Sequence, residues 1–260
     1  MIKFFRKIRQ NLLSENKFSK YLLYAIGEIL LVMIGILLAL QLNNWNENRK
    51  DLKKEQLILQ NLEKNLVFNL RELNQTFEST KTGYNASLQL LELIKPESSI
   101  HATYKVDSLI AVILTYYTYD PATGVIDEII NSGQLNLIRN EELKNLVSNW
   151  SRVMTDVQKN FDIADGHLYN VLIPYLMENS NLRNIPRQPH LFRKTDLPKI
   201  PPSNFRSDYK PLVTSLKFEN LVNQHSWNLL WIINEYMDIQ SYLEMTISLL
   251  ENEIQYSEEG

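Results

Sequence analysis

The chain has no cysteine, and this absence removes several classes of function at once. Disulfide bonds, thiolate metal sites and cysteine nucleophiles are excluded across its 260 residues. Glycine is scarce, with seven in all, which favours long helices over β-sandwiches because sandwiches need frequent turns. The formal net charge of −3 provides no strong positive field. We therefore predict no nucleic-acid partner.

The motifs of common catalytic sites are also missing: there is no GxSxG, P-loop, HExxH or glycine-rich dinucleotide turn. Asp162, Asp165 and His167 invite a metal interpretation. On a helix, however, His167 lies about 140° from Asp162, whereas metal-binding helices place their ligands at i and i+3 or i+4. His225 falls in a predicted core stripe, where we expect a hydrogen-bonded core histidine. The sequence predicts no catalytic residue, no metal and no cofactor.

Only one apolar run is long enough to cross a lipid bilayer, and it covers Tyr21–Leu42. At about 1.5 Å of rise per residue, this run spans roughly the 30 Å hydrocarbon thickness. It contains one ionisable residue, Glu28, and no proline. The alternative is a cleaved signal peptide, which needs small residues at −3 and −1 of its cleavage site. Residues 39–45 offer no such pair, so we predict an uncleaved transmembrane helix over residues 21–42.

Basic residues flank this run on both sides. The leader, residues 1–20, has the pattern of an amphipathic helix on an anionic leaflet, or simply of a flank that sets orientation. Its basic residues, opposed only by Glu15, are Lys3, Arg6, Lys7, Arg9, Lys17 and Lys20. Beyond the run, Arg49, Lys50, Lys53 and Lys54 are nearly matched by Glu47, Asp51 and Glu55. Counting Lys and Arg alone, the positive-inside rule predicts a cytoplasmic leader and an external domain.

The sequence around this run resembles a known family. Residues 27–47 read GEILLVMIGILLALQLNNWNE, which is similar to the anchor segment of uncharacterised bacterial membrane proteins with a domain of unknown function. The likeness is close over residues 4–50 and looser over residues 132–140. It implies a single-anchor protein of Gram-negative bacteria with a helical remainder, but no activity. With the charge count, it predicts an inner-membrane protein whose N-terminus is cytoplasmic and whose C-terminal domain is periplasmic.

Residues 43–94 are predicted to form one long helix or two nearly continuous ones. Leucines repeat every seven residues, as in a coiled coil, at Leu52, Leu59, Leu66 and Leu73. The second heptad column is interrupted by Gln56, Glu63 and Asn69. A self-sufficient coiled coil fills both columns, so we favour a core stripe of a multi-helix bundle. Gly83 is a candidate break, and Pro96 ends the segment.

The middle of the chain carries several helix signals. Val106–Tyr119 is apolar enough for a short buried helix. Asp120-Pro121 is predicted to begin the next helix, which ends in a left-handed turn at Gly133. Asn140 is predicted to cap a long helix with Glu141 and Glu142 in its first turn and a kink near Pro174.

The last helix, predicted over Leu216–Gln255, has the cleanest apolar period of three or four residues. Long amphipathic helices of this kind predict an all-α fold, namely an elongated antiparallel helical bundle over residues 43–260. Residues 181–211 interrupt it with six of the nine prolines and no helical period, which predicts an extended loop.

Two groups of residues are candidates for binding. The loop interleaves basic and aromatic residues that suit anionic headgroups, a glycan or an acidic protein, unless its aromatics simply pack back on the bundle. We select Arg183, Arg187, Phe192, Arg193, Lys194 and Arg206. In the anchor, Glu28, Gly35 and Ala39 fall on one helical face, where small residues allow close helix approach. An ionisable residue on this face favours a helix–helix contact. Two alternatives stay open: that Glu28 lies at the level of the lipid headgroups, or that it relays protons together with a partner protein.

The function that these features favour is a membrane-anchored interaction or sensory module without catalytic activity. Its expected partners are the lipid bilayer and either further copies of itself or another membrane protein. The alternatives are an accessory subunit of a polytopic membrane complex, which would pack against the Glu28 face, and an enzyme whose site assembles from scattered residues.

Overall fold

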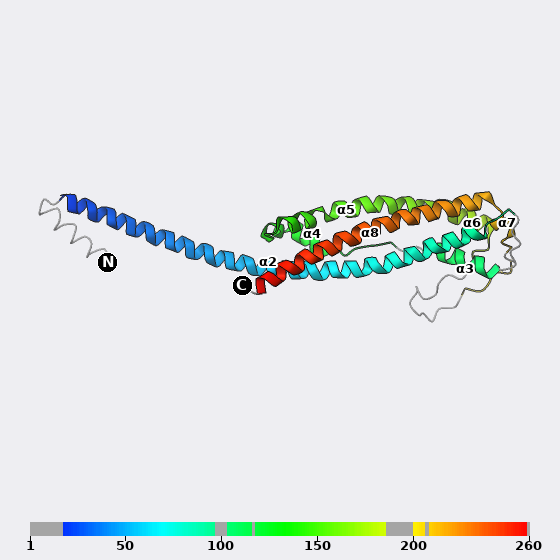
Figure 1. Ribbon diagram of the computed structural model, residues 1–260, viewed down its shortest axis with the longest axis horizontal. Coiled ribbons are helices and arrows are strands. Elements are labelled where there is room, and N and C mark those ends of the chain that lie inside the picture. Colours follow the sequence, from blue (N-terminus) through cyan, green and yellow to red (C-terminus); the bar gives the residue numbers. More distant parts are fainter. Residues whose placement is uncertain (1–17, 97–102, 116–117, 186–199, 206–207, 259–260) are drawn as a thin grey trace. The chain divides into compact units, whose positions relative to one another are not determined.

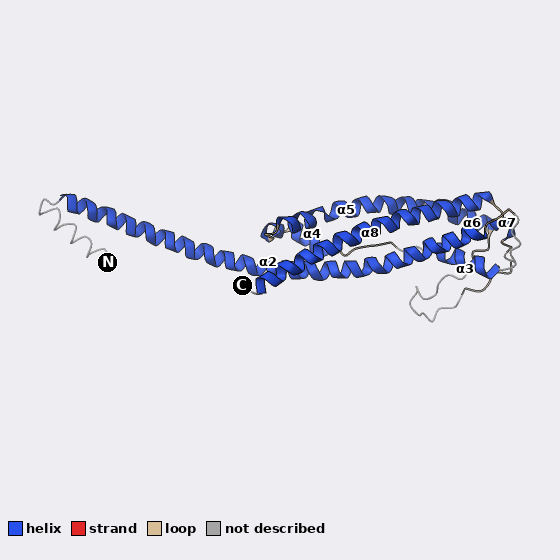
Figure 2. Ribbon diagram, viewed as in Figure 1, coloured by secondary structure: helices blue, strands red, loops and turns tan. Residues whose placement is uncertain are grey.

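The computed structural model of the chain describes residues 18–96, 103–115, 118–185, 200–205 and 208–258. Every regular element in these ranges is a helix, which confirms the all-α prediction (Figure 2). The elements labelled in Figure 1, with two short irregular helices, are α2 (Phe18–Leu93), α3 (Thr103–Ile113), α4 (Gly124–Asn131), η1 (Gln134–Leu137), α5 (Glu141–His167), η2 (Leu168–Leu172), α6 (Ile173–Asn179), α7 (Lys210–Val213) and α8 (Leu216–Glu258). The chain divides into two compact units, residues 1–57 and 58–260, which we describe separately.

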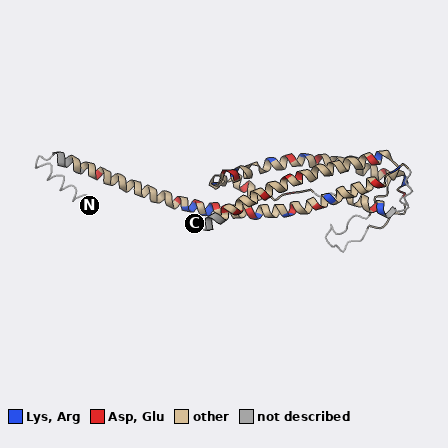
Figure 3. Ribbon diagram, viewed as in Figure 1, with Lys and Arg blue, Asp and Glu red and all other residues tan. Residues whose placement is uncertain are grey.

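The described part of the first unit is the N-terminal portion of α2. This helix is long and apolar enough to cross a membrane, and no residue in its apolar window is buried. Between Leu22 and Leu42, Glu28 is the single charged residue, and charged residues resume along the ribbon after Leu42 (Figure 3). The predicted leader, residues 1–20, lies almost entirely outside the described residues.

The second unit is a bundle in which α8 runs antiparallel to α5 (Figure 1). Three contacts fix this direction, because residue numbers rise along one helix as they fall along the other. They join Asn140 Nδ2 to Glu253 Oε1 at 2.7 Å, Asn160 Nδ2 to Glu235 Oε1 at 2.8 Å, and His167 Nε2 to the Leu221 carbonyl at 3.0 Å. The start of the bundle portion of α2 packs with the C-terminal half of α8, so α8 is antiparallel to α2 as well.

Because α2 and α5 therefore run in the same direction, the chain between them must return along the bundle. It does so through α3, an extended stretch that includes Tyr119, and α4 (Figure 1). Tyr119 is buried in the core. The Asn69 side chain on α2 holds this stretch by two hydrogen bonds to the Ala122 backbone, at 2.9 Å from the N–H and 3.1 Å to the carbonyl.

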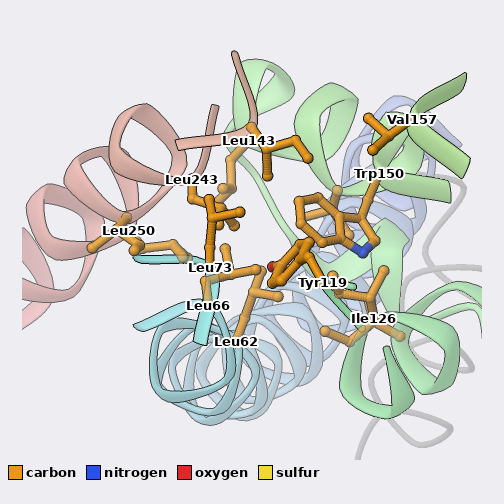
Figure 4. Close-up of a cluster of buried hydrophobic side chains, with 14 of the residues drawn as sticks. Leu62, Leu66, Leu73, Tyr119, Ile126, Leu143, Trp150, Val157, Leu243 and Leu250 are labelled. Atoms are coloured by element: carbon orange, nitrogen blue, oxygen red, sulfur yellow. The ribbon is translucent and has the colours of Figure 1, made fainter. Parts of the chain in front are cut away.

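The bundle has two buried apolar clusters. The larger one combines α2, α4, α5 and α8 around Trp150 and Tyr236, and Figure 4 shows its side chains converging from these helices. Tyr236 contacts the rings of Phe77, Tyr119 and Phe161 at centroid distances of 6.1, 6.4 and 5.7 Å. The second cluster joins the end of α2 to α3, η2, α6, α7 and the start of α8.

Several predicted boundaries hold. Gly133 has φ +76° and follows α4, as the left-handed turn requires. The Asn140 side chain accepts a hydrogen bond from the Leu143 amide at 3.0 Å and caps α5. Near Pro174, where a kink is predicted, the helix has a π-helical turn, η2, which directly precedes α6, and the proline lies in the first turn of α6.

Other boundaries were wrong. The helix α3 ends at Ile113, before Tyr119. The helix α4 begins at Gly124 instead of near Pro121, because Asn69 holds the preceding Ala122 backbone in the extended connection. Gly83 does not break α2. A Cβ built at Gly83 lies 3.4 Å from Leu229 Cδ1 on α8, an ordinary van der Waals contact, so Gly83 lies in the interface between α2 and α8.

Candidate functional site

The predicted anchor face lies on an unbroken helix. Because α2 passes through Glu28, Gly35 and Ala39 without interruption, the helical period places all three on one side. Gly35 and Ala39 are exposed, and Glu28 is half-buried. A Cβ built at Gly35 meets no other atom within 4 Å. No contact within the described chain therefore explains this glycine, and its surface is open to a second helix.

Of the six residues predicted to form a binding loop, Arg183 is described and exposed. Arg187, Phe192, Arg193, Lys194 and Arg206 lie outside the described residues. The described parts, 181–185 and 200–205, are joined by side-chain to backbone hydrogen bonds. These run from Asn181 Nδ2 to the Phe205 carbonyl at 2.9 Å, from Arg183 Nε to the Pro201 carbonyl at 2.7 Å, and from the Ser203 amide to Asn184 Oδ1 at 2.8 Å.

This hydrogen-bonded pair of segments presents apolar side chains to solvent. Ile200 and Phe205 are each 82% exposed. The alternative in which the loop aromatics pack back on the bundle is therefore wrong at Phe205, and it is confirmed at Tyr209, which is buried in the second apolar cluster. Arg183 is bonded next to Ile200, through Nε to the Pro201 carbonyl, which leaves the other N–H groups of its guanidinium available to a partner. The arrangement combines a positive charge with exposed apolar area, which suits a macromolecular surface.

The C-terminal end of the loop is attached to α3. The buried Tyr209 hydroxyl donates a hydrogen bond to Asp107 Oδ1. Burial raises the pKa of the Asp107 carboxyl, and this hydrogen bond opposes the rise. Asp208 Oδ1 accepts from the Lys210 amide at 3.0 Å, at the start of α7.

The residues considered for a metal site are spread apart. Asp162 is exposed and accepts a hydrogen bond from Gln158, while His167 Nε2 turns to the Leu221 carbonyl of α8. Burial, followed by the charge of Asp162, raises the pKa of the Asp165 carboxyl. Within the described ranges, no group of three or more His, Asp or Glu side chains is placed to hold a metal ion.

The structure instead pairs the two histidines, which the sequence analysis did not connect. The rings of His167 and His225 stack with centroids 6.2 Å apart and an interplanar angle of 24°. Burial, with a smaller contribution from His167, lowers the pKa of His225 to about 4, and burial also lowers the pKa of His167. His225 is only 1% exposed, as predicted for a core residue. The hydrogen bond predicted for His225 is not formed, because neither ring nitrogen has a hydrogen-bond partner within the described chain. The nearby Ile113 backbone raises the pKa of His225, but by less than burial lowers it.

The chain belongs to a family of unknown function, DUF6090, whose model matches residues 28–173. The match begins at Glu28 and includes most of the apolar run, the return connection and α5. It confirms the resemblance to a family with a domain of unknown function. The chain matches no curated protein and no solved structure.

Proposed function

We propose that this DUF6090 member is a single-pass inner-membrane protein whose helical bundle lies in the periplasm and acts by binding partners, without catalysis. The observation that carries the proposal is the exposed apolar surface of α2 between Leu22 and Leu42. Leaving a large apolar side chain in water forgoes about 1.5–3 kcal/mol relative to burial. A run of such residues on every side of a helix is stable in hydrocarbon, where the helix satisfies its own backbone hydrogen bonds.

The first partner we propose is a second copy of the chain, through the face with Glu28, Gly35 and Ala39. Small residues allow close backbone approach, and a carboxyl group in hydrocarbon gains from a polar partner. The open space at Gly35 supports this choice. A polytopic membrane protein that packs on the same face is the second candidate, favoured by the single ionisable residue of the run. The exposed loop side chains Ile200 and Phe205 support a further contact outside the membrane.

Single cysteines test the anchor and its orientation, because the natural chain contains none. We expect Ile34→Cys to resist a membrane-impermeant maleimide in spheroplasts and to react after detergent is added. Asn61→Cys, at an exposed position of the bundle, should react in intact spheroplasts. Labelling of Ile34→Cys without detergent would disprove the anchor, and protection of Asn61→Cys until lysis would reverse the orientation.

Matched glycine substitutions test the self-association. Gly35→Leu should lower the cross-linked dimer fraction in native membranes, because leucine prevents close approach. Gly27→Leu is the control, since Gly27 also faces open space but lies about 80° from Gly35 around the helix. Equal dimer fractions in wild type and both variants would reject the homodimer seam. If the same polytopic membrane protein were cross-linked through Glu28→Cys in repeated experiments, that result would favour the role of an accessory subunit in a polytopic complex.

A further inference from the structure

The stretch of α2 that follows the apolar run separates its charges by sign. With 3.6 residues per turn, Arg49, Lys53 and Lys50 lie about 40°, 80° and 140° around the helix from Trp45. The carboxylates of Glu47, Asp51 and Glu55 lie at about 200–280° on the same scale. A sequence count finds these charges nearly balanced, but the helix places Arg49 and Lys53 on the side of Trp45 with Lys50 at the edge of that side, while Lys54, at about 180°, lies next to the carboxylates.

The contacts of this stretch leave the basic side free for a ligand. Lys54 is paired with Asp51 at 3.0 Å, and Glu47 accepts a hydrogen bond from Asn43 at 3.1 Å. Within the described chain, Arg49, Lys50 and Lys53 are exposed and form no ion pair. The Arg49 guanidinium carbon lies 6.0 Å from the centroid of the Trp45 ring, which is 63% exposed. At this distance the guanidinium is attracted to the face of the indole ring by a cation–π interaction, so that the pair presents a positive charge next to an apolar ring.

Trp45 lies within the headgroup region of a bilayer and the basic residues lie beyond it: Arg49 is a few ångströms further out, and Lys53, about 8–11 Å further out, acts through its charge over a Debye length. From Leu42, the last residue of the apolar run, the helical rise places Trp45 about 4.5 Å, Arg49 about 10 Å and Lys53 about 16 Å further along. Each headgroup region is about 5–8 Å thick. Lys and Arg side chains extend several ångströms back towards such a region while their aliphatic parts stay on apolar surface. Tryptophan favours this boundary because its ring is apolar and its N–H is polar.

We infer that Trp45, Arg49, Lys50 and Lys53, here called the basic collar, form a binding site for the headgroups of anionic phospholipids. The inference rests on the proposed membrane anchor. Charge complementarity selects an anionic headgroup over a zwitterionic one. Continuity with the apolar run selects a phospholipid over a free phosphate, because the acyl chains of a bound lipid lie along the C-terminal half of the run, which ends at Leu42, while its phosphate meets the collar.

The test uses the full-length protein purified in mild detergent and exchanged into an equimolar mixture of phosphatidylglycerol and phosphatidylcholine. Native mass spectrometry then counts the retained lipids of each class. We expect wild type to retain phosphatidylglycerol preferentially. The triple variant Arg49→Gln/Lys50→Gln/Lys53→Gln should lower the ratio of the two lipids at least about fivefold, the gain expected from even one basic residue at an anionic surface.

The matched control, Lys64→Gln/Arg71→Gln/Arg152→Gln, removes the same charge from exposed positions of the bundle and should keep the wild-type ratio. The basic leader is present in every variant, so the difference isolates the collar. Equal ratios for the two triple variants, or no lipid preference in wild type, would overturn the inference. Displacement of the bound lipid by inorganic phosphate alone would also overturn it, because the site would then recognise phosphate without the acyl chains. Protection of Ile34→Cys in spheroplasts, measured separately, would show that the anchor stands even if the collar fails.

Discussion

The two ends of α2 are both helical, but their apolar side chains differ in exposure. Between Leu22 and Leu42 the helix is apolar on all sides, and its large side chains are exposed. From Ile58 onward it buries one stripe, which includes Leu59, Leu62 and Leu66, and exposes mostly polar residues. The comparison shows that helix formation alone does not distinguish a membrane span from a bundle helix. What distinguishes them is whether other parts of the chain cover the apolar side chains.

The same substitution at each end gives the largest expected contrast. Leu62 is fully buried, so Leu62→Ala should lower the free energy of unfolding of the bundle by about 2–5 kcal/mol, through lost burial and the cavity left behind. Leu37 lies in the apolar run and is 58% exposed. Leu37→Ala should therefore leave the free energy of unfolding of the bundle unchanged within measurement. Urea unfolding of full-length protein in mild detergent, followed by tryptophan fluorescence, to which the buried Trp150 contributes, measures both. Equal losses would show that the two ends of α2 unfold as one packed structure.

Acid should weaken the bundle and leave the apolar run unchanged. In the folded bundle the pKa of His225 is about 4, below its ordinary value of 6.5, because the ring is buried. Between these pH values the unfolded chain binds more protons, so stability is complete above about pH 6.5 and falls as the pH drops towards 4. The loss through His225 is about 3 kcal/mol at most. The lowered pKa of His167 acts in the same direction, whereas the raised pKa of Asp165 acts against it.

The measurement is urea unfolding at several pH values between 4 and 7 for wild type and for His225→Leu. The variant should lose most of the pH dependence in this range, because it lacks the His225 imidazole. Its other titrating groups are the same as in wild type, so the difference between the two proteins reports His225. An unchanged slope of stability against pH in the variant would show that His225 is not the group responsible.

Much of this fold could be predicted from local patterns. Apolar spacing identified α8 and most of α5, and cap chemistry identified Gly133 and Asn140, because these signals act within a few residues. The apolar run identified the candidate span through length and composition alone.

The wrong predictions depend on contacts between distant residues. In the sequence, Asn69 only interrupts a heptad column. The fold shows that it binds the backbone of Ala122, 53 positions away, which keeps that residue extended, so that α4 begins at Gly124. Gly83 is a candidate helix break in the sequence, but α2 continues through it and places it against Leu229 of α8. The stacking of His167 on His225 likewise follows from the register of α5 and α8, which no local pattern contains. For the anchor face and most of the loop residues, the predictions remain predictions.

A polar residue inside the bundle end of α2 gives the smallest and most specific contrast. Asn69 is fully buried, and its two hydrogen bonds to the Ala122 backbone attach the return connection to α2. A lost buried hydrogen bond costs about 1–3 kcal/mol when the partner stays unsatisfied. Because Ala122 itself is exposed, water can replace part of the bonding, and we expect Asn69→Ala to lower the free energy of unfolding by about 1–2 kcal/mol.

The control is Asn61→Ala, an exposed asparagine of the same helix, which should change stability by no more than about 0.5 kcal/mol. Stability alone does not show that the connection is released, so the second measurement is hydrogen exchange at the Ala122 amide. In wild type this N–H is bound to Asn69 Oδ1 and should be protected. In Asn69→Ala it should exchange faster by about tenfold, the factor that a loss of about 1.4 kcal/mol gives for a local opening. Unchanged protection at Ala122 together with a loss of stability would mean that Asn69 acts through packing instead of attaching the connection.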